Sequence, residues 1–584
     1  MAVATDGEPR TKVPLSARRR RWRLEPRYLV LGVVALLVAY IALVPVVTMM
    51  VAAFQSNFLG AGSTHWTLHN FTKTFTGPGF GSLVATSFIY AGATAVVSTV
   101  IGFGMAWLVS RTNTPLRGFA GAAAVIPLII PGILNTVAWA LLFSPRIGPL
   151  NHLLQAVGLP IFNIYSVPGM VFIQSIHVTP IAFLMGTAAF MSMDSSLEEA
   201  AAASGARPLK VFRSVTLRLV RPAILSAALL MFIQTISTFE VPQLIGVPGH
   251  KFVFVSRIYD ALQAFPADYG SVGVIGVFVL AIAAVGLFLA QWLSRRSASQ
   301  TVTGKGFRPQ RTDLGRWKWA GLAVVIAFFL VAVVLPLAML FWSSLLPGYR
   351  SPSWSALKFV SLANYRAVWT TPALISSVEH SVVTAVAAGA IVTVLAAVTA
   401  YITVKTRIRG RLLLDGLATV PIAVPSIVLG VGILYWYLVA PLPFHLYGTL
   451  AILIAAFVAI GLPYGMRYLA PGMAQINDEL EEAATASGAG WLQAFRRVYI
   501  PLLMPSLLAA FLYTMIVAFR EISAAIFLYS SDTEVMSVKV YDLWSNGDYP
   551  VVAALGIVMV LFLTVVVLVV RVLGGRIGIT TSGH

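Results

Sequence analysis

Ionisable side chains that lie within long apolar runs are the residues of this chain with the clearest capacity for chemistry. Glu240 stands in the run Thr-Phe-Glu-Val-Pro, and Glu521 follows Arg520 in the run Phe-Arg-Glu-Ile-Ser. Burying such groups in an apolar environment is costly, so they are functional hypotheses by default. Two facing carboxylates could hold a cation in passing, whereas Arg520 and Arg467 would suit an anionic ligand or chelate. The structural alternative, in which each acid caps or breaks a helix against a basic neighbour, carries equal weight.

Other chemistry finds little support in the sequence. His65 and His69 have the spacing of a helical metal pair, but the corresponding segment before Asn364 has no histidine, so we expect no metal site there. Gly304-Lys305 lacks the preceding glycine of a phosphate-binding loop, and Phe307 stands where Ser or Thr is required. There is no cysteine. We therefore expect no catalytic residue and no cofactor bound by this chain.

A polar segment occurs twice in the chain, in nearly the same letters. Residues 194–205 read Asp-Ser-Ser-Leu-Glu-Glu-Ala-Ala-Ala-Ala-Ser-Gly, and residues 477–488 read Asn-Asp-Glu-Leu-Glu-Glu-Ala-Ala-Thr-Ala-Ser-Gly. The alanines favour helix, and Gly205 and Gly488 provide a stop signal at its end. Each copy predicts a helix of about two to three turns, with small side chains that let a partner approach closely.

The start of each short helix is also predicted by its residue types. Ser195 and Asp478 are good N-cap residues. Glu198 and Glu481 follow three residues later, which is the spacing of a capping box.

The repeated segment resembles the EAA loop of binding-protein-dependent ABC importer permeases, a coupling helix that docks into a cleft of the ATPase subunit. The family pattern of Glu-Ala-Ala, three residues, Gly and then nine residues to Ile-x-Leu-Pro is nearly matched. The second copy ends in Val-Tyr-Ile-Pro501, whereas the first ends in Val-Thr-Leu-Arg218, so its proline is lost and we expect asymmetry there. The resemblance assigns ATPase coupling to Glu198, Glu199, Ala200, Ala201, Gly205, Glu481, Glu482, Ala483, Ala484 and Gly488.

Composition indicates a membrane protein. Of the 584 residues, 58% are hydrophobic and only 10% are charged, which is too apolar for a soluble protein of this size. The net charge of +19 could suggest a nucleic-acid partner. However, the basic residues form short clusters between apolar runs, as the positive-inside rule places them, so the expected environment is a lipid bilayer and no nucleic acid.

The apolar runs predict about twelve membrane-spanning helices and an all-α polytopic fold. Each is near or above the ~20 residues that a bilayer requires. They lie near 29–54, 83–110, 118–143, 166–191, 219–246, 271–293, 319–343, 379–404, 412–439, 447–471, 502–528 and 551–571. The first run is too long for the core of a cleavable signal peptide. Alternation from a cytoplasmic start places both repeated loops and both termini on the cytoplasmic side, with the basic clusters.

Two further pairs of segments extend the repeat to most of the chain. Asn70-Phe71 matches Asn364-Tyr365, and 126–131 matches 420–425, each with two prolines that should kink a span. We therefore expect two tandem permease halves, related as parallel repeats. The expected parts are a cytoplasmic basic N-terminus at 1–28, a first half at 29–293 with its EAA loop at 194–222, a cytoplasmic linker at 294–318, a second half at 319–573 with its EAA loop at 477–505, and a cytoplasmic tail at 574–584.

The resemblance implies a type I ABC importer permease in a bacterial cell membrane, with no ATPase site of its own. Its partners would be two copies of an ABC ATPase, which bind ATP and magnesium, and an extracytoplasmic substrate-binding protein. Two fused halves are similar to the ferric-iron permeases, and less closely to those for thiamine or 2-aminoethylphosphonate; the segment 519–528 looks like the iron type. An ion-gradient-driven secondary transporter and a non-transporting scaffold are the alternatives from other classes. The repeated coupling loop argues against both.

Overall fold

The computed structural model describes residues 26–56, 63–194, 196–298, 312–440 and 446–576. These residues are mostly helical, and the only extended pairing among them is two isolated bridges. Ten helices in the described part are long and apolar enough to cross a membrane, and two bent helix pairs raise the number to twelve. The predicted all-α fold and the predicted number of spans are confirmed.

The first half contains five long helices with shorter elements between them. The long helices are α1 (Pro26–Phe54), α3 (Phe80–Arg111), α7 (Val167–Met191), α10 (Leu217–Ile236) and α12 (Tyr269–Ala298). The shorter elements are α2 (His69–Thr76), α4 (Arg117–Val125), η1 (Ile126–Ile129), α5 (Gly132–Leu142), α6 (Pro149–Ala156), α8 (Ser196–Ala203), α9 (Pro208–Val211), η2 (Phe212–Thr216), η3 (Pro242–Gly246) and α11 (Phe254–Gln263).

The second half repeats this order. Its first span is built from α13 (Lys318–Phe329), η5 (Leu330–Val334) and α14 (Leu335–Ser344). The other long helices are α16 (Pro372–Ala400), α19 (Leu450–Gln475), α22 (Ile500–Arg520) and α25 (Tyr549–Arg576). The shorter elements are η4 (Gly315–Trp317), η6 (Ala356–Phe359), α15 (Ala363–Thr370), η7 (Tyr401–Lys405), α17 (Arg411–Thr419), η8 (Val420–Ala423), α18 (Ser426–Val439), α20 (Glu479–Ala486), α21 (Trp491–Ala494), η9 (Phe495–Tyr499), α23 (Ala525–Leu528) and α24 (Met536–Ser545).

The paired prolines break one span in each half. The pair of α4–η1 and α5 is bent by 96°, and the pair of α17–η8 and α18 is bent by 108°. Ile130 and Val424, the residues before Pro131 and Pro425, are extended, because a following proline disfavours helical backbone. The predicted kinks are therefore confirmed, and they are close to right angles.

The two matching asparagines, Asn70 and Asn364, make the same kind of contact in both halves. The Asn70 side-chain amide donates to the carbonyls of Ala53 and Gln55, just beyond the end of the first span. The Asn364 amide donates in the same way to the carbonyls of Ser344 and Leu346, both at 2.8 Å. Each asparagine thus satisfies carbonyl groups that the end of a helix leaves without an intrahelical partner.

The two halves exchange their first helices. Helix α1 packs on α16, α17, α18 and α19 of the second half as well as on α12 of its own half. Helices α13 and α14 pack on α3, α4 and α5 of the first half, and α14 also packs on α25 of its own half. A Cβ atom at Gly432 of α18 would lie 2.1 Å from the carbonyl oxygen of Pro45, so only glycine lets α18 and α1 approach this closely. The Trp436 indole also donates to the Tyr40 hydroxyl at 2.7 Å. Each half is therefore completed by a helix of the other.

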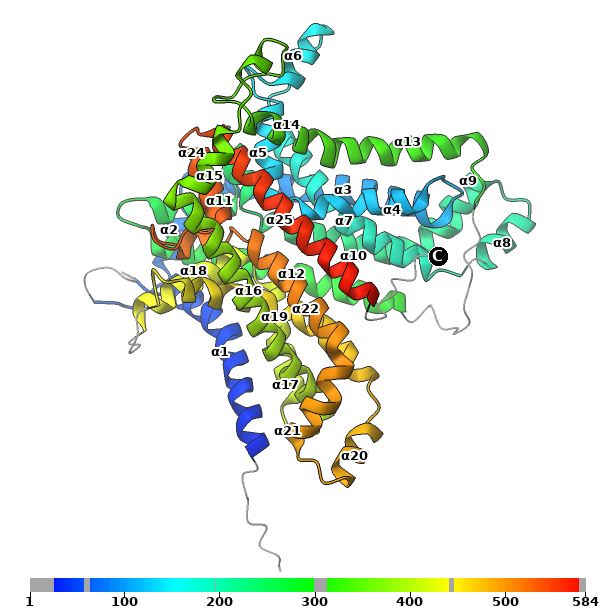
Figure 1. The fold of residues 1–584 in the computed structure, drawn as a ribbon, viewed down its shortest axis with the longest axis vertical. Helices are drawn as coiled ribbons and strands as arrows, with labels where there is room; N and C mark the ends of the chain where they lie inside the picture. The colour runs from blue at the N-terminus through cyan, green and yellow to red at the C-terminus, as the bar shows by residue number, and fades with distance from the viewer. Residues whose placement is uncertain (1–25, 57–62, 195, 299–311, 441–445, 577–584) are drawn as a thin grey trace, which may run out of the picture.

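The helices form two arms that diverge (Figure 1). One arm contains α3, α4, α7, α10 and the borrowed α13, and it ends in α8. The other contains α16, α17, α19, α22 and the borrowed α1, and it ends in α20. The two predicted coupling helices therefore lie at the far ends of separate arms, away from the region where the halves meet.

Candidate coupling and translocation site

The two coupling helices end as the sequence predicts. Gly205 and Gly488 each have a φ of +82°, in the left-handed region that favours glycine. The next residue in each copy closes the helix: the Ala206 N–H donates to the Ala201 carbonyl, and the Ala489 N–H donates to the Ala484 carbonyl. This is the hydrogen bond of a Schellman stop.

The predicted caps at the start of the helices are wrong where the structure describes them. Ser195 lies outside the described residues. Asp478 has helical backbone angles and makes no side-chain capping bond; its carboxylate instead accepts from the Lys405 ammonium at 2.5 Å. The Asn477 side chain accepts from the Glu479 N–H in its place. A charged partner from another helix competes successfully with a neutral N–H for the carboxylate.

Glu198 fastens the first coupling helix to the rest of its arm. The Arg111 guanidinium, at the end of α3, donates to one oxygen of Glu198 at 2.6 Å, and the Thr216 hydroxyl donates to the other. Arg111 is buried, with 2% of its side chain exposed. Glu198 therefore joins α8, α3 and η2.

Glu481 does the same in the second arm with different donors. The Tyr401 hydroxyl donates to one carboxylate oxygen at 2.8 Å, and the Tyr499 hydroxyl donates to the other at 2.5 Å. Tyr499 occupies the repeat position of Thr216. We call the two groups, Arg111–Glu198–Thr216 and Tyr401–Glu481–Tyr499, the first and second coupling clamps.

The remaining predicted coupling residues differ in exposure. Glu199 and Glu482 are exposed, as are Ala200 and Ala483. Ala201 and Ala484 are half-buried on the side of the arm. In each copy the first glutamate is thus a structural anchor, and the second glutamate stands on a free face of small residues.

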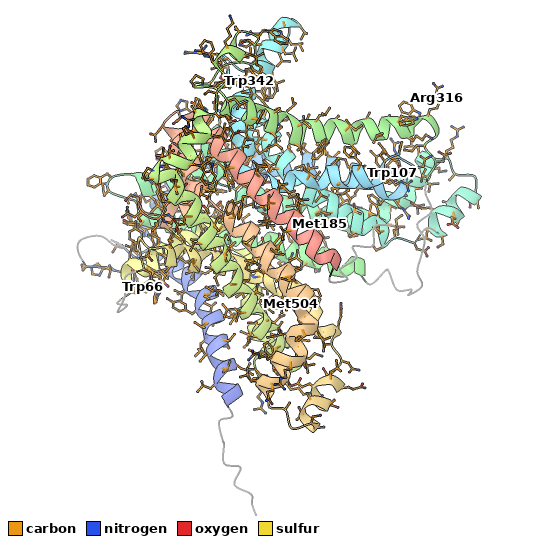
Figure 2. The ribbon with its side chains drawn as sticks, viewed as in Figure 1. Trp66, Trp107, Met185, Arg316, Trp342 and Met504 are labelled. Atoms are coloured by element: carbon orange, nitrogen blue, oxygen red, sulfur yellow. The ribbon has the colours of Figure 1, made fainter. Side chains whose placement is uncertain are left out.

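The lost proline at Arg218 does not change the exit of the first loop. The segments η2 and η9 occupy matching positions in the repeat and have the same wide helical turn. In the first arm the Trp107 ring packs on Phe212 at 5.0 Å (Figure 2 labels Trp107 on this arm). In the second arm Tyr401 packs on Phe495 at 5.6 Å. Aromatic packing at equivalent positions sets both exits, so the asymmetry expected from the sequence is absent here.

Three of the ionisable residues predicted from the sequence, Glu240, Glu521 and Arg520, come together where the halves meet, whereas Arg467 is exposed. Glu240 is the fourth residue after α10, and Glu521 is the first residue after α22. The two carboxylates are close enough to interact electrostatically with each other and with the Arg520 guanidinium. The fourth member, His177 of α7, is one that the sequence reasoning passed over. The sequence feature that could have indicated His177 is the one that indicated Glu240 and Glu521: an ionisable residue within a membrane span.

Gly132 leaves space where two of these side chains meet. A Cβ atom there would lie 3.2 Å from Glu240 Oε1 and 3.3 Å from His177 Nε2. Gly132 is the first residue of α5, directly after the proline break. The break also frees the carbonyl of Leu128, which accepts from the Arg520 guanidinium at 2.8 Å. The carbonyl group freed by the proline break is thus used for a contact between the halves.

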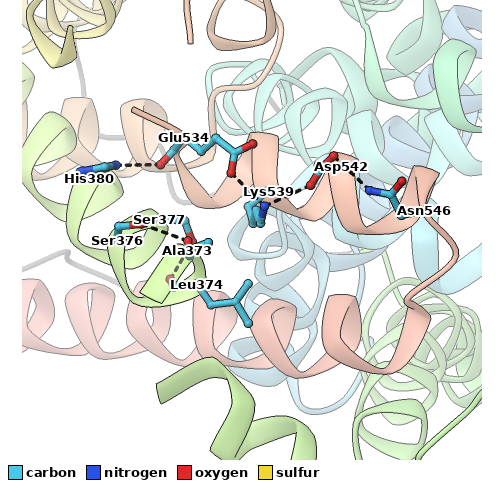
Figure 3. Close-up of polar contacts among 9 residues, drawn as sticks. All are labelled: Ala373, Leu374, Ser376, Ser377, His380, Glu534, Lys539, Asp542 and Asn546. Atoms are coloured by element: carbon cyan, nitrogen blue, oxygen red, sulfur yellow. Dashed lines mark hydrogen bonds and ion pairs between the residues drawn. The ribbon is translucent and has the colours of Figure 1, made fainter. Parts of the chain in front are cut away.

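The segment after Glu521 is held by its own polar contacts. The Glu521 carboxylate accepts from the Ala524 N–H at 3.2 Å, three residues further along the chain. The Ser537 hydroxyl of α24 donates to the Glu521 carbonyl at 2.8 Å. Figure 3 shows Lys539 between two carboxylates of the same region, Glu534 at 2.9 Å and Asp542 at 3.1 Å.

The two carboxylates around Lys539 change the pKa of its ammonium group. Burial lowers the pKa of Lys539, but hydrogen bonds from its ammonium to Glu534 and Asp542 outweigh burial, and the pKa lies above its ordinary value. The His380 imidazole of α16 in turn donates to the Glu534 carbonyl at 3.1 Å (Figure 3). The loop that follows Glu521 is therefore tied to α16.

The two histidines considered for a metal site, His65 and His69, are both exposed. His65 is exposed, and its ring nitrogen contacts the Ser63 hydroxyl at 2.8 Å. Within the described ranges, no group of three or more His, Cys, Asp or Glu side chains is arranged to hold a metal ion.

Comparison with known proteins places the chain among transport proteins. It is 26% identical over 497 residues to the ferric transport system permease protein FbpB of Actinobacillus pleuropneumoniae, covering 83% of this chain and 70% of that protein. A putative ferric transport system permease protein FbpB 1 of Haemophilus influenzae is 26% identical, covering 78% and 71%. The sulfate transport system permease protein CysT of Salmonella typhimurium is 28% identical over 239 residues, which are 39% of this chain and 86% of that protein.

Among solved structures, a chain of a bacterial alginate ABC transporter in complex with an alginate pentasaccharide-bound periplasmic protein aligns with a TM-score of 0.35 and 20% identity. It covers 41% of this chain and 85% of that chain. The family profile described as "Binding-protein-dependent transport system inner membrane component" matches residues 98–299 and 389–579, one match in each half. Because these matches cover more than half of the sequence, this multi-pass protein belongs to the family of binding-protein-dependent transport system inner membrane components.

Proposed function

We propose that this chain is the membrane-spanning permease of an ATP-driven importer, and that two copies of an ATPase subunit dock on α8 and α20. The observation that carries the proposal is the pair of coupling helices at the ends of two arms, each anchored by its first glutamate and each exposing its second. ATP and magnesium belong to the ATPase partner. The basic clusters support a cytoplasmic position for the coupling helices and both termini.

The contacts between the halves suggest how ATP binding is transmitted. The arms meet at Arg520 and Leu128, and again at Gln243, whose amide donates to the Tyr541 hydroxyl at 3.1 Å. Closure of two ATPases would draw α8 and α20 together. Because the coupling clamps tie each helix to its spans, each arm would move as one body, and the contacts between the halves would separate.

Ferric iron, delivered by an extracytoplasmic binding protein, is the substrate we propose. Curated relatives that match most of the chain are named for ferric transport. The cluster of Glu240, Glu521 and Arg520 has a formal net charge of −1, and carboxylate oxygens suit hard cations. We place these residues on the translocation pathway, where Glu240 and His177 pack directly against Gly132.

The experiment is uptake of radiolabelled ferric iron into liposomes that contain the chain, its ATPase and its binding protein. We expect ATP-dependent uptake, and we expect the double variant Glu199→Ala and Glu482→Ala to lose both ATPase co-purification and uptake. Asp260→Ala is the matched control, because it removes an exposed carboxylate from α11, away from the coupling helices.

Two results would contradict the proposal at different points. Iron uptake driven by a proton gradient without any ATPase would indicate a secondary transporter. ATP-dependent uptake of thiamine or 2-aminoethylphosphonate, with no uptake of iron, would keep the importer and replace its substrate.

A further inference from the structure

A basic hollow lies beside the first coupling helix and has no role in the proposed transport cycle. It has a volume of about 460 Å³ and opens to the outside. Its lining consists of Arg207, Leu209, Lys210, Arg213, Ser214 and Arg218. All four basic side chains are exposed, and no acidic side chain lines the hollow. In the part of the chain that the structure describes, no ion pair joins any of them to a carboxylate.

Helical spacing gathers these charges on one side. α9, η2 and α10 follow one another without a break, and the basic residues occur at intervals of three, three and five positions along them. Residues three or four apart on a helix are neighbours on its surface. Phe212 packs on Trp107 of α3. The hollow therefore lies on a side of this helix that does not pack on α3.

The length of this helix indicates where the hollow lies relative to a bilayer. The apolar span runs from Leu209 to Ile236, 28 residues, or roughly 42 Å at 1.5 Å per residue. A bilayer core of about 30 Å leaves roughly 12 Å, or about eight residues, in the headgroup layer. The basic residues run from Arg207, two positions before this span, to Arg218, its tenth residue, and they lie beside the exposed Leu209 and Leu217. Long basic side chains can lay their stems on such apolar surface and keep their charges among the headgroups.

The repeat shows that this charge is specific to the first half. The equivalent positions in the second half are Gly490, Gln493, Arg496, Arg497 and Pro501. They carry two positive charges instead of four. A general preference for basic residues on the cytoplasmic side would act on both loops alike, so it does not account for the difference.

We propose that the hollow binds the phosphate headgroup of an anionic phospholipid of the cytoplasmic leaflet. Several cationic donors around one space, at headgroup level and next to exposed leucines, match a phosphate that is attached to acyl chains. The bound lipid holds the cytoplasmic end of the first arm at the membrane surface. The proposal relies on the cytoplasmic orientation given above, but not on the identity of the substrate.

The test measures lipid retention by the full chain, without ATPase, by native mass spectrometry after exchange between phosphatidylglycerol and phosphatidylcholine. The variant carries Lys210→Gln and Arg213→Gln, and the matched control carries Arg496→Gln and Arg497→Gln, so each loses two positive charges. We expect wild type and control to retain phosphatidylglycerol preferentially, and the variant to lose about tenfold of that preference. Unchanged thermal unfolding confirms that the variant is folded.

Three outcomes would overturn the proposal. Equal loss in variant and control would show a diffuse charge effect. Full competition by inorganic phosphate would show a site for free anions. Unchanged lipid retention together with lost ATPase binding would assign the hollow to the ATPase. The lipid measurement uses the permease alone. Its result can therefore be interpreted even if the proposed transport function is wrong.

Discussion

Arg111 and Glu198 form a 2.6 Å ion pair between side chains that are 87 residues apart in the sequence. The pair joins the end of a membrane span to the first turn of the first coupling helix. The linker between the halves reaches the same point, because the Thr312 N–H donates to the Arg111 carbonyl at 2.9 Å. The coupling helix is therefore fixed to the membrane-spanning core by a buried charge.

Glu198→Gln is expected to destabilise the protein, and Glu199→Gln is not. The first change leaves the Arg111 charge buried without a compensating carboxylate, and two of its guanidinium nitrogens have no other partner among the described residues; we expect a loss of roughly 3 kcal/mol. The second removes an exposed charge and should change stability by less than about 0.5 kcal/mol. Thermal unfolding of both variants in one detergent measures the difference. Equal effects would show that Glu198 is not an anchor.

Gly205→Ala and Gly488→Ala are each expected to cost about 1–2 kcal/mol, because an L side chain is strained at a φ of +82°. Open space surrounds both positions, so backbone conformation alone causes the cost. Gly490→Ala is the control, because Gly490 has a φ of −70° and is equally open. Coupled ATP hydrolysis and thermal unfolding report the effect. If the control is as harmful as the other two, strain is not the cause.

Gly432→Ala tests the exchange of first helices. A Cβ atom would press on the Pro45 carbonyl, so α1 and α18 would have to separate, at a cost of roughly 1–3 kcal/mol. Gly416→Ala on α17 meets nothing within 4 Å and should be neutral or stabilising, since alanine favours helix. A lower unfolding temperature is expected for the first variant alone. No difference between the two would mean that α1 does not contact α18 closely.

Gly132→Ala tests the proposed pathway. The added methyl group would press on Glu240 and His177 and displace them, so we expect several-fold slower uptake with normal ATPase binding. Gly121→Ala on α4 is the matched control, because its nearest neighbour, Val109, is 4.0 Å away. Normal uptake by Gly132→Ala would place the pathway elsewhere.

Asp268 predicts a pH dependence of stability outside the spans. Burial raises its pKa, but hydrogen bonds from Lys73 and Ser271 outweigh burial and hold the pKa below its usual value. A depressed pKa stabilises the fold above the unfolded value of about 4, and this stability is lost as the pH falls through the folded pKa. The contribution is no more than about 1 kcal/mol, since Lys73 is half exposed. Lys73→Met should reduce the fall in unfolding temperature between about pH 5 and about pH 3. An unchanged fall would contradict this.

Local patterns in the sequence determined much of this protein. Apolar run length determined the spans, because the bilayer requires a minimum helix length. The glycines determined the ends of the coupling helices, because backbone conformation at Gly205 and Gly488 depends on few neighbours. The prolines determined the breaks, and the repeated letters determined the two halves.

The tertiary structure decided the contacts between distant residues. Capping was predicted for Glu481 and Asp478 from their local spacing, but Tyr401 and Lys405, which belong to another element, donate to these carboxylates instead. The exchange of first helices also left no local pattern, because an apolar helix has similar outer faces whichever half it packs on. Which charged groups and which helix faces meet depends on distances in the folded protein. The spacing of residues along the sequence does not give these distances.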